Sequence, residues 1–546
     1  MRREVGERSV RRRGLAVPVV VSLAVVAALA AWSAGATTKA AAIAVSPASG
    51  PPTQKVTVHG TGFGNGESVS ILFDATQQTT GAADSSGAFA ALFTVPKSAQ
   101  PGRHTVTANG QTSGLHATDA FLVRTAWPRF HFSNGSTGYN PYENTLGPSN
   151  VSTLAEAWTS PLFGNEVESP AVAGGTLYVA SRDQHLYAFS AAGTTGCSGT
   201  PKICQPLWSA LPHGGYAIGS TPAVSGAFVY VGTDDHQLYA YSAAGTKGCS
   251  GTPKVCQPLW TASTGDIVTS SPVVASGVVY VGSYDHDLYA FSASGKTNCS
   301  GTPKVCQPLW VGQTKGEIRA APAVANGYVY VNSGAGDGNL NVFSTGGCGG
   351  AVCAPLWTSP VGSPYSNSSP AVGPNGLVYV GSSYGYLYAY SARGTTNCSG
   401  TPKVCQVVWY APLYGGAQDS PAVAGNVVYI GSDRSMLFAF QATANPSCTG
   451  SPPVCPPLWT SPDLGSSAYV RSSPAVANGV VYAGDDNHQV YAFPAAGNVG
   501  CGGVPKVCQP LWSATTGGYI DSSPAVVDGM LYIGSSDGKL HAYALP

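Results

Sequence analysis

Eight copies of one pattern, about fifty residues apart, constrain the fold of this 546-residue chain more than any other feature. In each copy a Pro precedes Ala-Val or Val-Val, a Tyr follows in a Val-Tyr-Val-Gly-like segment, and a Trp marks a further segment. The Pro column is Pro170, Pro222, Pro272, Pro322, Pro370, Pro421, Pro474 and Pro524. The Tyr column is Tyr178, Tyr230, Tyr280, Tyr330, Tyr379, Tyr429, Tyr482 and Tyr532. The Trp column is Trp158, Trp208, Trp260, Trp310, Trp357, Trp409, Trp459 and Trp512. A period in this range is typical of a propeller, a solenoid or an array.

Each copy contains four short strand-like segments, which favours a propeller. In one copy they cover residues 271–275, 278–282, 288–292 and 308–311, each with alternating or continuous apolar residues bounded by turn residues. Four strands per repeat make a propeller blade. Only 10% of the residues are charged, as expected for blades that are covered on both faces. The sequence therefore predicts an all-β, eight-bladed β-propeller of four-stranded blades.

The ends of the repeated region predict how this ring closes. Trp158 precedes the first Pro of the series, Pro170, whereas the last repeat reaches Pro546 without a Trp segment of its own. We therefore expect the N-terminal strand around Trp158 to complete the last blade. Closure of this kind leaves no unpaired strand edge.

The 14 cysteines form seven pairs, each between the third strand and the Trp of one repeat. The pairs are Cys197 with Cys204, Cys249 with Cys256, Cys299 with Cys306, Cys348 with Cys353, Cys398 with Cys405, Cys448 with Cys455, and Cys501 with Cys508. Local disulfides are expected in an exported protein. The alternative is zinc, which needs about four ligands per site, whereas each loop offers two Cys and no His.

Two segments precede the repeats. Residues 1–36 have the composition of a signal peptide: six arginines, an apolar run from Leu15 to Ala31, and a small-residue cleavage site at Ala34-Gly35-Ala36. An uncleaved signal anchor stays open, because a spanning helix needs only slightly more length. Residues 43–123 alternate short strands with turn clusters and predict a small Ig-like β-sandwich. We expect a secreted or cell-surface protein.

Residues 125–546 resemble the PQQ-binding-like, or quinoprotein dehydrogenase-like, β-propeller family. The resemblance rests on Val281-Gly282-Ser283 followed by Leu288-Tyr289-Ala290-Phe291 and a Trp, and on the entry segments at 127–130 and 137–141. Residues 46–63 resemble bacterial IPT/TIG and related Ig-like domains, which usually act as spacers. The propeller family includes cofactor-dependent alcohol dehydrogenases and a binding scaffold of the outer-membrane assembly machinery. This chain lacks the adjacent cysteine pair and the long insertions that the enzymes carry.

Binding residues are expected between each Trp strand and the next Pro-Ala-Val strand, in segments that line one face around the central channel. Charged residues recur there at Glu166, Glu168, Asp266, Glu317, Arg319, Asp419, Arg471 and Asp521. Aromatic residues join them at Phe163, Tyr216, Tyr365, Tyr414, Tyr469 and Tyr519. A concave mouth with a few polar groups is where ligands usually bind, although loops are also polar without a function.

A column of histidines, His236, His286 and His488, suggests turn chemistry more than a metal site. Equivalent residues of a ring lie on a circumference and are too far apart to share a metal ion, so no metal site is predicted.

The leading function is an exported, non-enzymatic binding or protein-interaction scaffold, with no catalytic residue and no cofactor. The alternative is a PQQ-dependent quinoprotein oxidoreductase that holds PQQ and calcium in the central mouth. A third hypothesis is a lyase or glycosidase, which needs a close acid–base pair; Glu166, Glu168 and Asp419 are the candidates.

The partner is an unidentified protein or small molecule at the propeller face. Lys plus Arg and Asp plus Glu each number 26, so no basic excess points to nucleic acid. We expect a monomer that contacts a membrane only through an N-terminal anchor.

Overall fold

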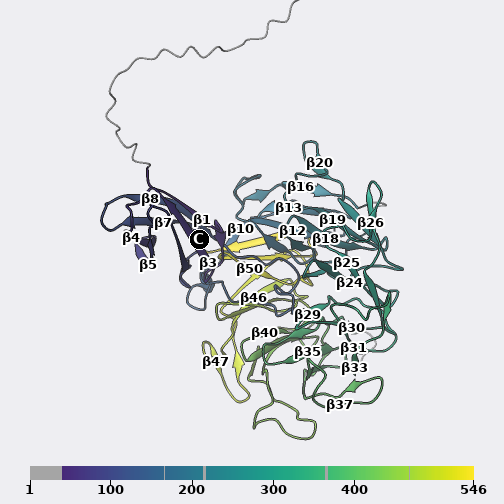
Figure 1. Ribbon diagram of the computed structural model, residues 1–546. Helices are drawn as coiled ribbons and strands as arrows, with labels where there is room; N and C mark the ends of the chain where they lie inside the picture. The colour runs from purple at the N-terminus through teal and green to yellow at the C-terminus, as the bar shows by residue number, and fades with distance from the viewer. Residues whose placement is uncertain (1–39, 165, 213–216, 363–366, 467) are drawn as a thin grey trace, which may run out of the picture.

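The computed structural model describes residues 40–164, 166–212, 217–362, 367–466 and 468–546, and nearly all of its regular secondary structure is β-strand (Figure 1). The segment expected to be a signal peptide or anchor, residues 1–36, lies outside the described residues. Within the described part of the chain, no helix has the length and apolar character needed to cross a membrane. The predicted all-β fold class is confirmed.

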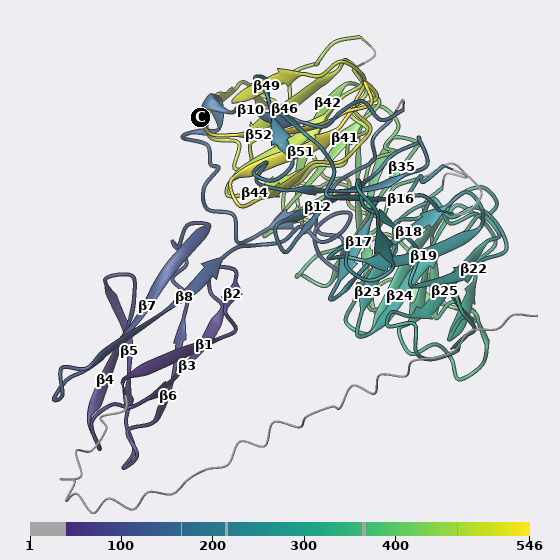
Figure 2. The same ribbon diagram turned by 90° about the horizontal axis from the view of Figure 1, so that it is seen from above.

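Two sheets over one core form the N-terminal part. One sheet has the strand order β1-β3-β6 and the other the order β2-β8-β7-β4-β5. Their bounds are β1 (Ala42–Ser46), β2 (Ser49–Gly50), β3 (Lys55–Thr61), β4 (Ser68–Phe73), β5 (Thr76–Ala82), β6 (Phe89–Thr94), β7 (Gly102–Gly110) and β8 (His116–Val123). Alternate side chains of β3, Val56 and Val58, are fully buried against Ile71 and Phe121 in this core. Figure 2 shows this part beside the rest of the molecule. The two are joined where Asn144 Nδ2 donates a hydrogen bond of 2.8 Å to Ala99 O.

Eight sheets follow among the described residues, each built on four antiparallel strands and most of them extended by further short strands; we number them repeats 1 to 8 after the Pro column. The first strands are β11 (Ala171–Ala173), β17 (Ala223–Ser225), β23 (Val273–Ala275), β29 (Ala323–Ala325), β34 (Ala371–Val372), β40 (Ala422–Ala424), β44 (Ala475–Ala477) and β50 (Ala525–Val527). The second strands are β12 (Thr176–Ala180), β18 (Phe228–Thr233), β24 (Val278–Gly282), β30 (Tyr328–Ser333), β35 (Leu377–Ser382), β41 (Val427–Ser432), β45 (Val480–Gly484) and β51 (Met530–Gly534). The third strands are β13 (Leu186–Ser190), β19 (Gln237–Ser242), β25 (Asp287–Ser292), β31 (Asn339–Ser344), β36 (Tyr386–Ser391), β42 (Met436–Gln441), β46 (Gln489–Pro494) and β52 (Leu540–Ala544). The outer strands are β16 (Trp208–Ala210), β22 (Trp260–Ser263), β28 (Trp310–Gln313), β33 (Trp357–Pro360), β39 (Trp409–Pro412), β43 (Trp459–Thr460), β49 (Trp512–Thr515) and, for repeat 8, β10 (Ala155–Thr159).

The first strands form a closed ring, as in a β-propeller. Each contacts the first strand of the next repeat, and β50 contacts β11. The outer strand of repeat 8 comes from the other end of the chain: β10 pairs antiparallel with β52, with Trp158 opposite Ala542. Figure 1 accordingly shows β10 beside the yellow C-terminal strands. The predicted closure by the Trp158 strand is confirmed.

The Tyr and Trp columns explain why neighbouring repeats stay together. In seven of the eight repeats the Tyr hydroxyl donates to a carbonyl of the next repeat, for example Tyr230 Oη to Ala293 O at 2.8 Å. Tyr482 Oη has no partner among the described residues. The bond from Tyr532 Oη to Ala191 O, also 2.8 Å, joins repeat 8 to repeat 1. The Trp ring packs on the Tyr ring of its own repeat; the centroids of Trp260 and Tyr230 are 5.8 Å apart. Both columns therefore bury large rings between repeats, and most of the Tyr hydroxyl groups are hydrogen-bonded. Trp260 Nε1 and Trp357 Nε1 are buried without a partner among the described residues.

All seven predicted disulfides are present, and the described residues hold no free cysteine. The hairpins that they close include β14 (Cys197–Ser198), β15 (Ile203–Cys204), β20 (Cys249–Ser250), β21 (Val255–Cys256), β26 (Cys299–Ser300), β27 (Lys304–Cys306), β32 (Val352–Cys353), β37 (Cys398–Ser399), β38 (Val404–Cys405), β47 (Cys501–Gly502) and β48 (Val507–Cys508). The hairpins do not extend their own sheets. Each pairs in parallel with the outer strand of the preceding repeat, as β27 does with β22. The bridges therefore stabilise hairpins that connect neighbouring repeats, and the sequence did not indicate this pairing.

Replacing Cys299 and Cys306 by serine should lower the free energy of unfolding by about 2.5 kcal/mol, the chain-entropy value for an eight-residue loop. Denaturant unfolding without reductant measures this loss. Hydrogen exchange should show β22 exchanging faster, because the hairpin that pairs with it is less constrained.

Peptide mapping without reduction should recover seven local bridges. A bridge between different hairpins, or bound zinc, would contradict this arrangement.

Candidate functional site

A segment between the two parts of the chain occupies the middle of the ring. We call residues 125–147 the plug segment; it contains β9 (Tyr139–Asn140), and the 3-10 turn η1 (Val151–Thr153) follows it. It runs past the first strands and bonds to one repeat after another. Its partners are Trp127 with Val172, Pro128 O with Val224 N (2.7 Å), Asn134 O with Val324 N (2.6 Å), Gly135 O with Val372 N (2.8 Å), Thr137 O with Val423 N (2.7 Å), Gly138 O with Val476 N (2.7 Å) and Asn140 Nδ2 with Val526 O (2.9 Å). The plug segment thus closes the channel from one side.

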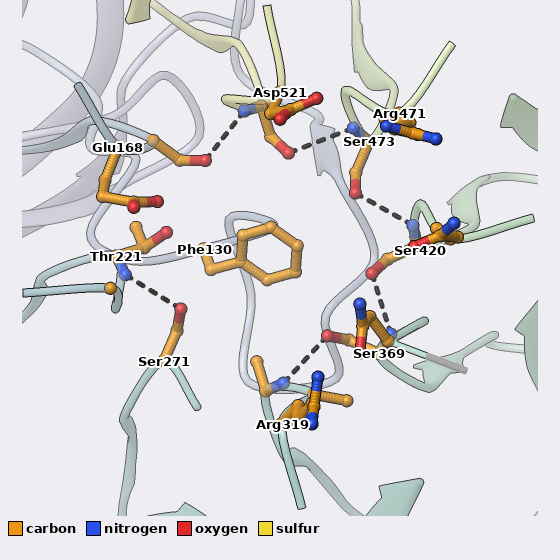
Figure 3. A pocket seen from close by; sticks show the side chains of 17 residues that line it. Phe130, Glu168, Thr221, Ser271, Arg319, Ser369, Ser420, Arg471, Ser473 and Asp521 are labelled. Carbon is orange, nitrogen blue, oxygen red and sulfur yellow. Dashed lines mark hydrogen bonds between the residues drawn. The ribbon is translucent and has the colours of Figure 1, made fainter. Parts of the chain in front are cut away.

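A cavity of about 180 Å³ lies over the plug segment, with the Phe130 ring at its centre (Figure 3). Every repeat lines it with the residue before its repeated Pro, eight positions in all, and seven repeats add at least one further residue. Seven of these eight carry a hydroxyl group, and we call them the hydroxyl ring: Ser169, Thr221, Ser271, Ser369, Ser420, Ser473 and Ser523. The eighth position, Ala321, carries none.

The hydroxyl ring is held by hydrogen bonds that cross from repeat to repeat (Figure 3). In each, a backbone N–H of one position donates to the side-chain oxygen of the next. The bonds are Thr221 N to Ser271 Oγ (3.0 Å), Ala321 N to Ser369 Oγ (2.9 Å), Ser369 N to Ser420 Oγ (2.8 Å), Ser420 N to Ser473 Oγ (2.9 Å), Ser473 N to Ser523 Oγ (3.1 Å) and Ser523 N to Ser169 Oγ (2.7 Å). Ala321 cannot accept such a bond from Ser271. The serine column therefore ties the repeats together and fixes the shape of the cavity.

Charged side chains form a wider opening above the hydroxyl ring. This outer cavity measures about 390 Å³. Its charged lining, which we call the rim, is Glu166, Glu168, Arg182, Arg319, Arg471 and Asp521. Both signs occur, so the rim suits a polar ligand that carries donors and acceptors rather than an apolar one.

The arginines of the rim are held by carboxylates and by aromatic rings. Arg182 Nε lies 2.7 Å from Glu166 Oε2 and 3.9 Å from Glu168 Oε1. Arg319 Nη2 lies 2.6 Å from Glu317 Oε2, and its Cζ lies 4.6 Å from the centroid of the Tyr284 ring. These pairs fix the guanidinium groups in place, and such preorganisation lowers the cost of binding.

Arg471 is the most connected charge of the rim. Its Nε lies 3.2 Å from Asp433 Oδ1 and its Nη1 lies 3.4 Å from Asp486 Oδ2. Its Cζ lies 4.9 Å from the centroid of the Tyr469 ring. Tyr469 and Tyr519 border a further hollow with Arg471 and Asp521, so two of the predicted aromatic residues do lie at this opening.

Burial makes three carboxyl groups at or beside the rim, Glu168, Asp486 and Asp521, harder to ionise. Burial, followed by repulsion from Glu166, raises the pKa of Glu168 to about 8. Burial, followed by repulsion from Asp521, raises the pKa of Asp486 to about 7, and burial raises the pKa of Asp521 as well. Glu168 and Asp486 therefore exchange protons near neutral pH, where a neutral carboxyl can both donate and accept a hydrogen bond.

Five of the eight predicted binding residues line the two cavities: Glu166, Glu168, Arg319, Arg471 and Asp521. Glu317 is tied to Arg319, and Asp266 Oδ1 instead lies 3.5 Å from Nε2 of the half-exposed His236. Asp419 corrects the prediction, because its side chain is buried in the wall, 1% exposed, and its neighbours Gln418 and Ser420 line the cavity in its place. It occupies a position at which other repeats carry serine.

The other described candidates that the sequence suggested do not line the two cavities. His236, His286 and His488 have positive φ angles of 63°, 75° and 67°, which agrees with the turn interpretation. Phe163 is buried and stacks on Tyr187, and Tyr414 is exposed. Tyr216 and Tyr365 lie outside the described residues. Among the described residues, no group of three or more His, Cys, Asp or Glu is placed to hold a metal ion.

Sequence reasoning missed Phe130 and the hydroxyl ring. The hydroxyl ring had a visible signal, because Ser or Thr precedes the Pro in seven of eight repeats. Phe130 had none, because it belongs to the unrepeated entry segment. Its neighbour Arg129 is buried, and burial lowers the pKa of its guanidinium to about 10.

Comparison with known proteins gives two family matches. The model described as outer membrane protein assembly factor BamB matches residues 103–293, 204–444 and 353–500. The model described as macroglobulin-like domain matches residues 38–123. No curated protein matches the chain.

Solved structures with a similar fold include a europium-containing methanol dehydrogenase (14% identity, TM-score 0.54, covering 77% of this chain and 98% of that one). BamB from Moraxella catarrhalis is also similar (14% identity, TM-score 0.51, 72% and 99% covered). A computationally designed protein, Ika8, gives comparable values (12% identity, TM-score 0.51, 71% and 99% covered). At these identities the likeness shows a common fold.

Proposed function

Because the chain belongs to the PQQ-like repeat family whose model is described as outer membrane protein assembly factor BamB, we propose that it is an exported, non-enzymatic scaffold. It binds a small polar molecule or a segment of a protein at the rim and the hydroxyl ring. No cofactor takes part. The scaffold works as a monomer, does not bind nucleic acid, and contacts a membrane only through an N-terminal anchor.

The proposal includes the division of the chain. Residues 1–36 are a signal peptide or signal anchor, residues 43–123 an Ig-like spacer, and residues 125–546 one eight-bladed propeller. Eight sheets joined in a closed ring of first strands support the blade number. Two sheets around one core support the sandwich.

The proposal rests on the polar cavity in the middle of the ring, which is closed on one side and open on the other. The plug segment closes the ring below, every repeat contributes at least one residue to the cavity, and the rim above holds three oriented arginines. A preformed hollow with a few fixed polar groups is the usual form of a binding site. Seven disulfides support an extracytoplasmic place, because such bonds persist in oxidising compartments.

Native mass spectrometry of the exported protein tests this function. The wild-type chain should retain a small molecule or peptide, and Arg471→Gln with Arg319→Gln should lose it, because both guanidinium groups line the two cavities. Arg103→Gln, on an exposed position of β7 in the N-terminal part, is the matched control and should retain it. Equal retention by the rim variant would place the ligand elsewhere and contradict the proposal.

The alternative, a PQQ-dependent oxidoreductase, fits the residues less well. Phe130 offers one aromatic face, and arginines are suitable partners for the carboxylates of PQQ. However, all 14 cysteines are used by hairpins, and the described residues offer no three-ligand group for calcium. We therefore derive no step through PQQ.

An assay separates the two functions. Incubation with PQQ and calcium, followed by dye reduction with a panel of alcohols and sugars, should give no turnover above that of the dye mixture alone. Robust turnover by the wild-type chain that is lost in Asp521→Asn would support the oxidoreductase function and refute the non-enzymatic scaffold. Arg103→Gln again serves as the control.

A further inference from the structure

Repeat 4 departs from the other repeats at one place on its side, away from the mouth. At one position of the third strand, seven repeats carry a ring: Tyr187, Tyr239, Tyr289, Tyr388, Phe438, Tyr491 and His541. Repeat 4 has Asn341 there. After the second Cys it has Ala354, where five repeats have Gln: Gln205, Gln257, Gln307, Gln406 and Gln509. Its cysteines are separated by five positions rather than the seven found in the others.

A cavity of about 400 Å³ opens at these departures. Asn341 and Asp337 line it from repeat 4, and Lys315 lines it from the loop just after the repeat 3 strand β28. Ala354, Pro355 and Pro402 supply apolar walls. The cavity shares no lining residue with the mouth.

Repeat 3 shows what fills this place elsewhere. Tyr289 Oη donates a hydrogen bond of 2.7 Å to Asp285 Oδ2, four residues before it, and accepts one of 3.2 Å from Gly265 N. Tyr187 and Tyr239 make the same bond to Asp183 and Asp235, at 2.7 and 2.6 Å. The aspartate is thus the built-in acceptor for a phenol hydroxyl.

Repeat 4 keeps the acceptor and lacks the phenol. Asp337 precedes Asn341 by four residues, as Asp285 precedes Tyr289. Lys315 follows Trp310 by five residues, as Gly265 follows Trp260. Asp337 Oδ1 accepts a hydrogen bond from Ser333 Oγ, and no described residue donates to its Oδ2. Asn341 Nδ2 donates instead to Ser333 Oγ at 2.8 Å and to Asn339 O at 3.2 Å.

We propose that this cavity binds a phenolic ring, which takes the place of the missing tyrosine side chain and donates its hydroxyl to Asp337. The prolines and Ala354 cover the ring faces, and the Lys315 stem closes the open side. The ring comes either from a free phenolic molecule or from a tyrosine side chain of another polypeptide. The proposal does not depend on a ligand at the mouth.

Fluorine NMR of the full exported chain with 4-fluorophenol tests the site. Binding should broaden the probe signal with a dissociation constant on the order of 1 mM, as expected for a ligand of this size. Fluorobenzene, which lacks the hydroxyl, should bind at least fivefold more weakly. Asp337→Asn should remove this preference, because the carboxylate is the proposed acceptor. Equal binding of the two probes by the wild-type chain would refute the phenol site.

Asn341→Tyr restores the ring of the other repeats and should reduce binding of 4-fluorophenol more than tenfold. Its melting temperature should be equal to or above that of the wild type. Ala354→Gln, which restores the common glutamine, narrows the cavity by a second route and should also weaken binding. Unchanged binding in a folded Asn341→Tyr protein would overturn the proposal. Competition with N-acetyltyrosine amide identifies the source: displacement at a similar concentration indicates a tyrosine side chain, and no displacement indicates a free phenol.

Discussion

Deleting residues 151–160 should unfold repeat 8 selectively and lower the stability of the whole ring. The deleted strand β10 is the outer strand of repeat 8, and it pairs with β52 and with the hairpin strand β15 of repeat 1. Hydrogen exchange should therefore become fast between Leu531 and Tyr543, while the N-terminal core around Val58 keeps its protection. Unchanged protection at Leu531–Tyr543 would refute closure by β10.

A point variant tests the same closure without removing backbone. Trp158 is 1% exposed, and truncating such a ring to alanine costs roughly 3–5 kcal/mol. Trp158→Ala should raise exchange at both chain ends of the ring, because its strand belongs to both. Trp260→Ala, in repeat 2, is the matched control: it removes an equally buried ring, and its effect should stay within repeats 2 and 3. Identical exchange patterns in the two variants would contradict a special role for β10.

Asp419→Ser should stabilise the protein at neutral pH. Ser368 accepts a hydrogen bond from Gly381 N in repeat 5, and Asp419 Oδ2 accepts the equivalent bond from Gly431 N at 2.6 Å in repeat 6. The second carboxyl oxygen, Oδ1, is buried without a partner among the described residues. Serine keeps the useful bond and removes the unpaired oxygen, a gain of roughly 1–3 kcal/mol.

This gain should depend on pH in a defined direction. Burial raises the pKa of Asp419 well above its usual range, so the folded state holds the proton after the unfolded state has lost it. The wild-type protein should therefore lose stability as pH rises above about 4, until the folded-state carboxyl also ionises. Asp419→Ser removes that loss, so its advantage should grow with pH in denaturant titrations.

The reverse substitution is the control for Asp419. Ser368→Asp puts a carboxyl at the same place in repeat 5 and should destabilise the protein by a similar amount with the same pH trend. A pH-independent gain in Asp419→Ser would show that the carboxyl is not held protonated. Loss of the retained ligand in Asp419→Ser would return Asp419 to the binding site, where the sequence had placed it.

The fold followed from the sequence because its information is local and repeated. The Pro, Tyr and Trp columns recur eight times, and a four-strand unit with both faces apolar can be covered only by its neighbours. The disulfide pairing followed for the same reason, since each pair joins positions at most seven apart.

The candidate site followed only in part. The sequence identified the segments that reach the mouth, and five of eight charged residues do line it. The sequence analysis grouped Asp419 with Asp521, although Asp419 lies two residues before its repeated Pro and Asp521 lies three residues before it. The structure shows that this shift of one position decides whether the side chain is buried in the wall or lines the cavity. It also could not find Phe130, whose place depends on a segment threaded across the ring.

The sequence by itself determined the strands, the repeat unit, the bridges and the closing strand, because each is encoded by residues that are close in the chain or recur at a fixed period. Only the tertiary structure decided which disulfide hairpin pairs with which sheet and which charged residues meet at the rim. It also decided that residues 125–147 fill the middle of the ring. These features bring together residues up to about 400 positions apart, such as Thr125 and Asp528. Such contacts depend on how each repeat is rotated relative to the next around the ring. That rotation is set by packing between sheets, and it leaves no periodic signal in the sequence.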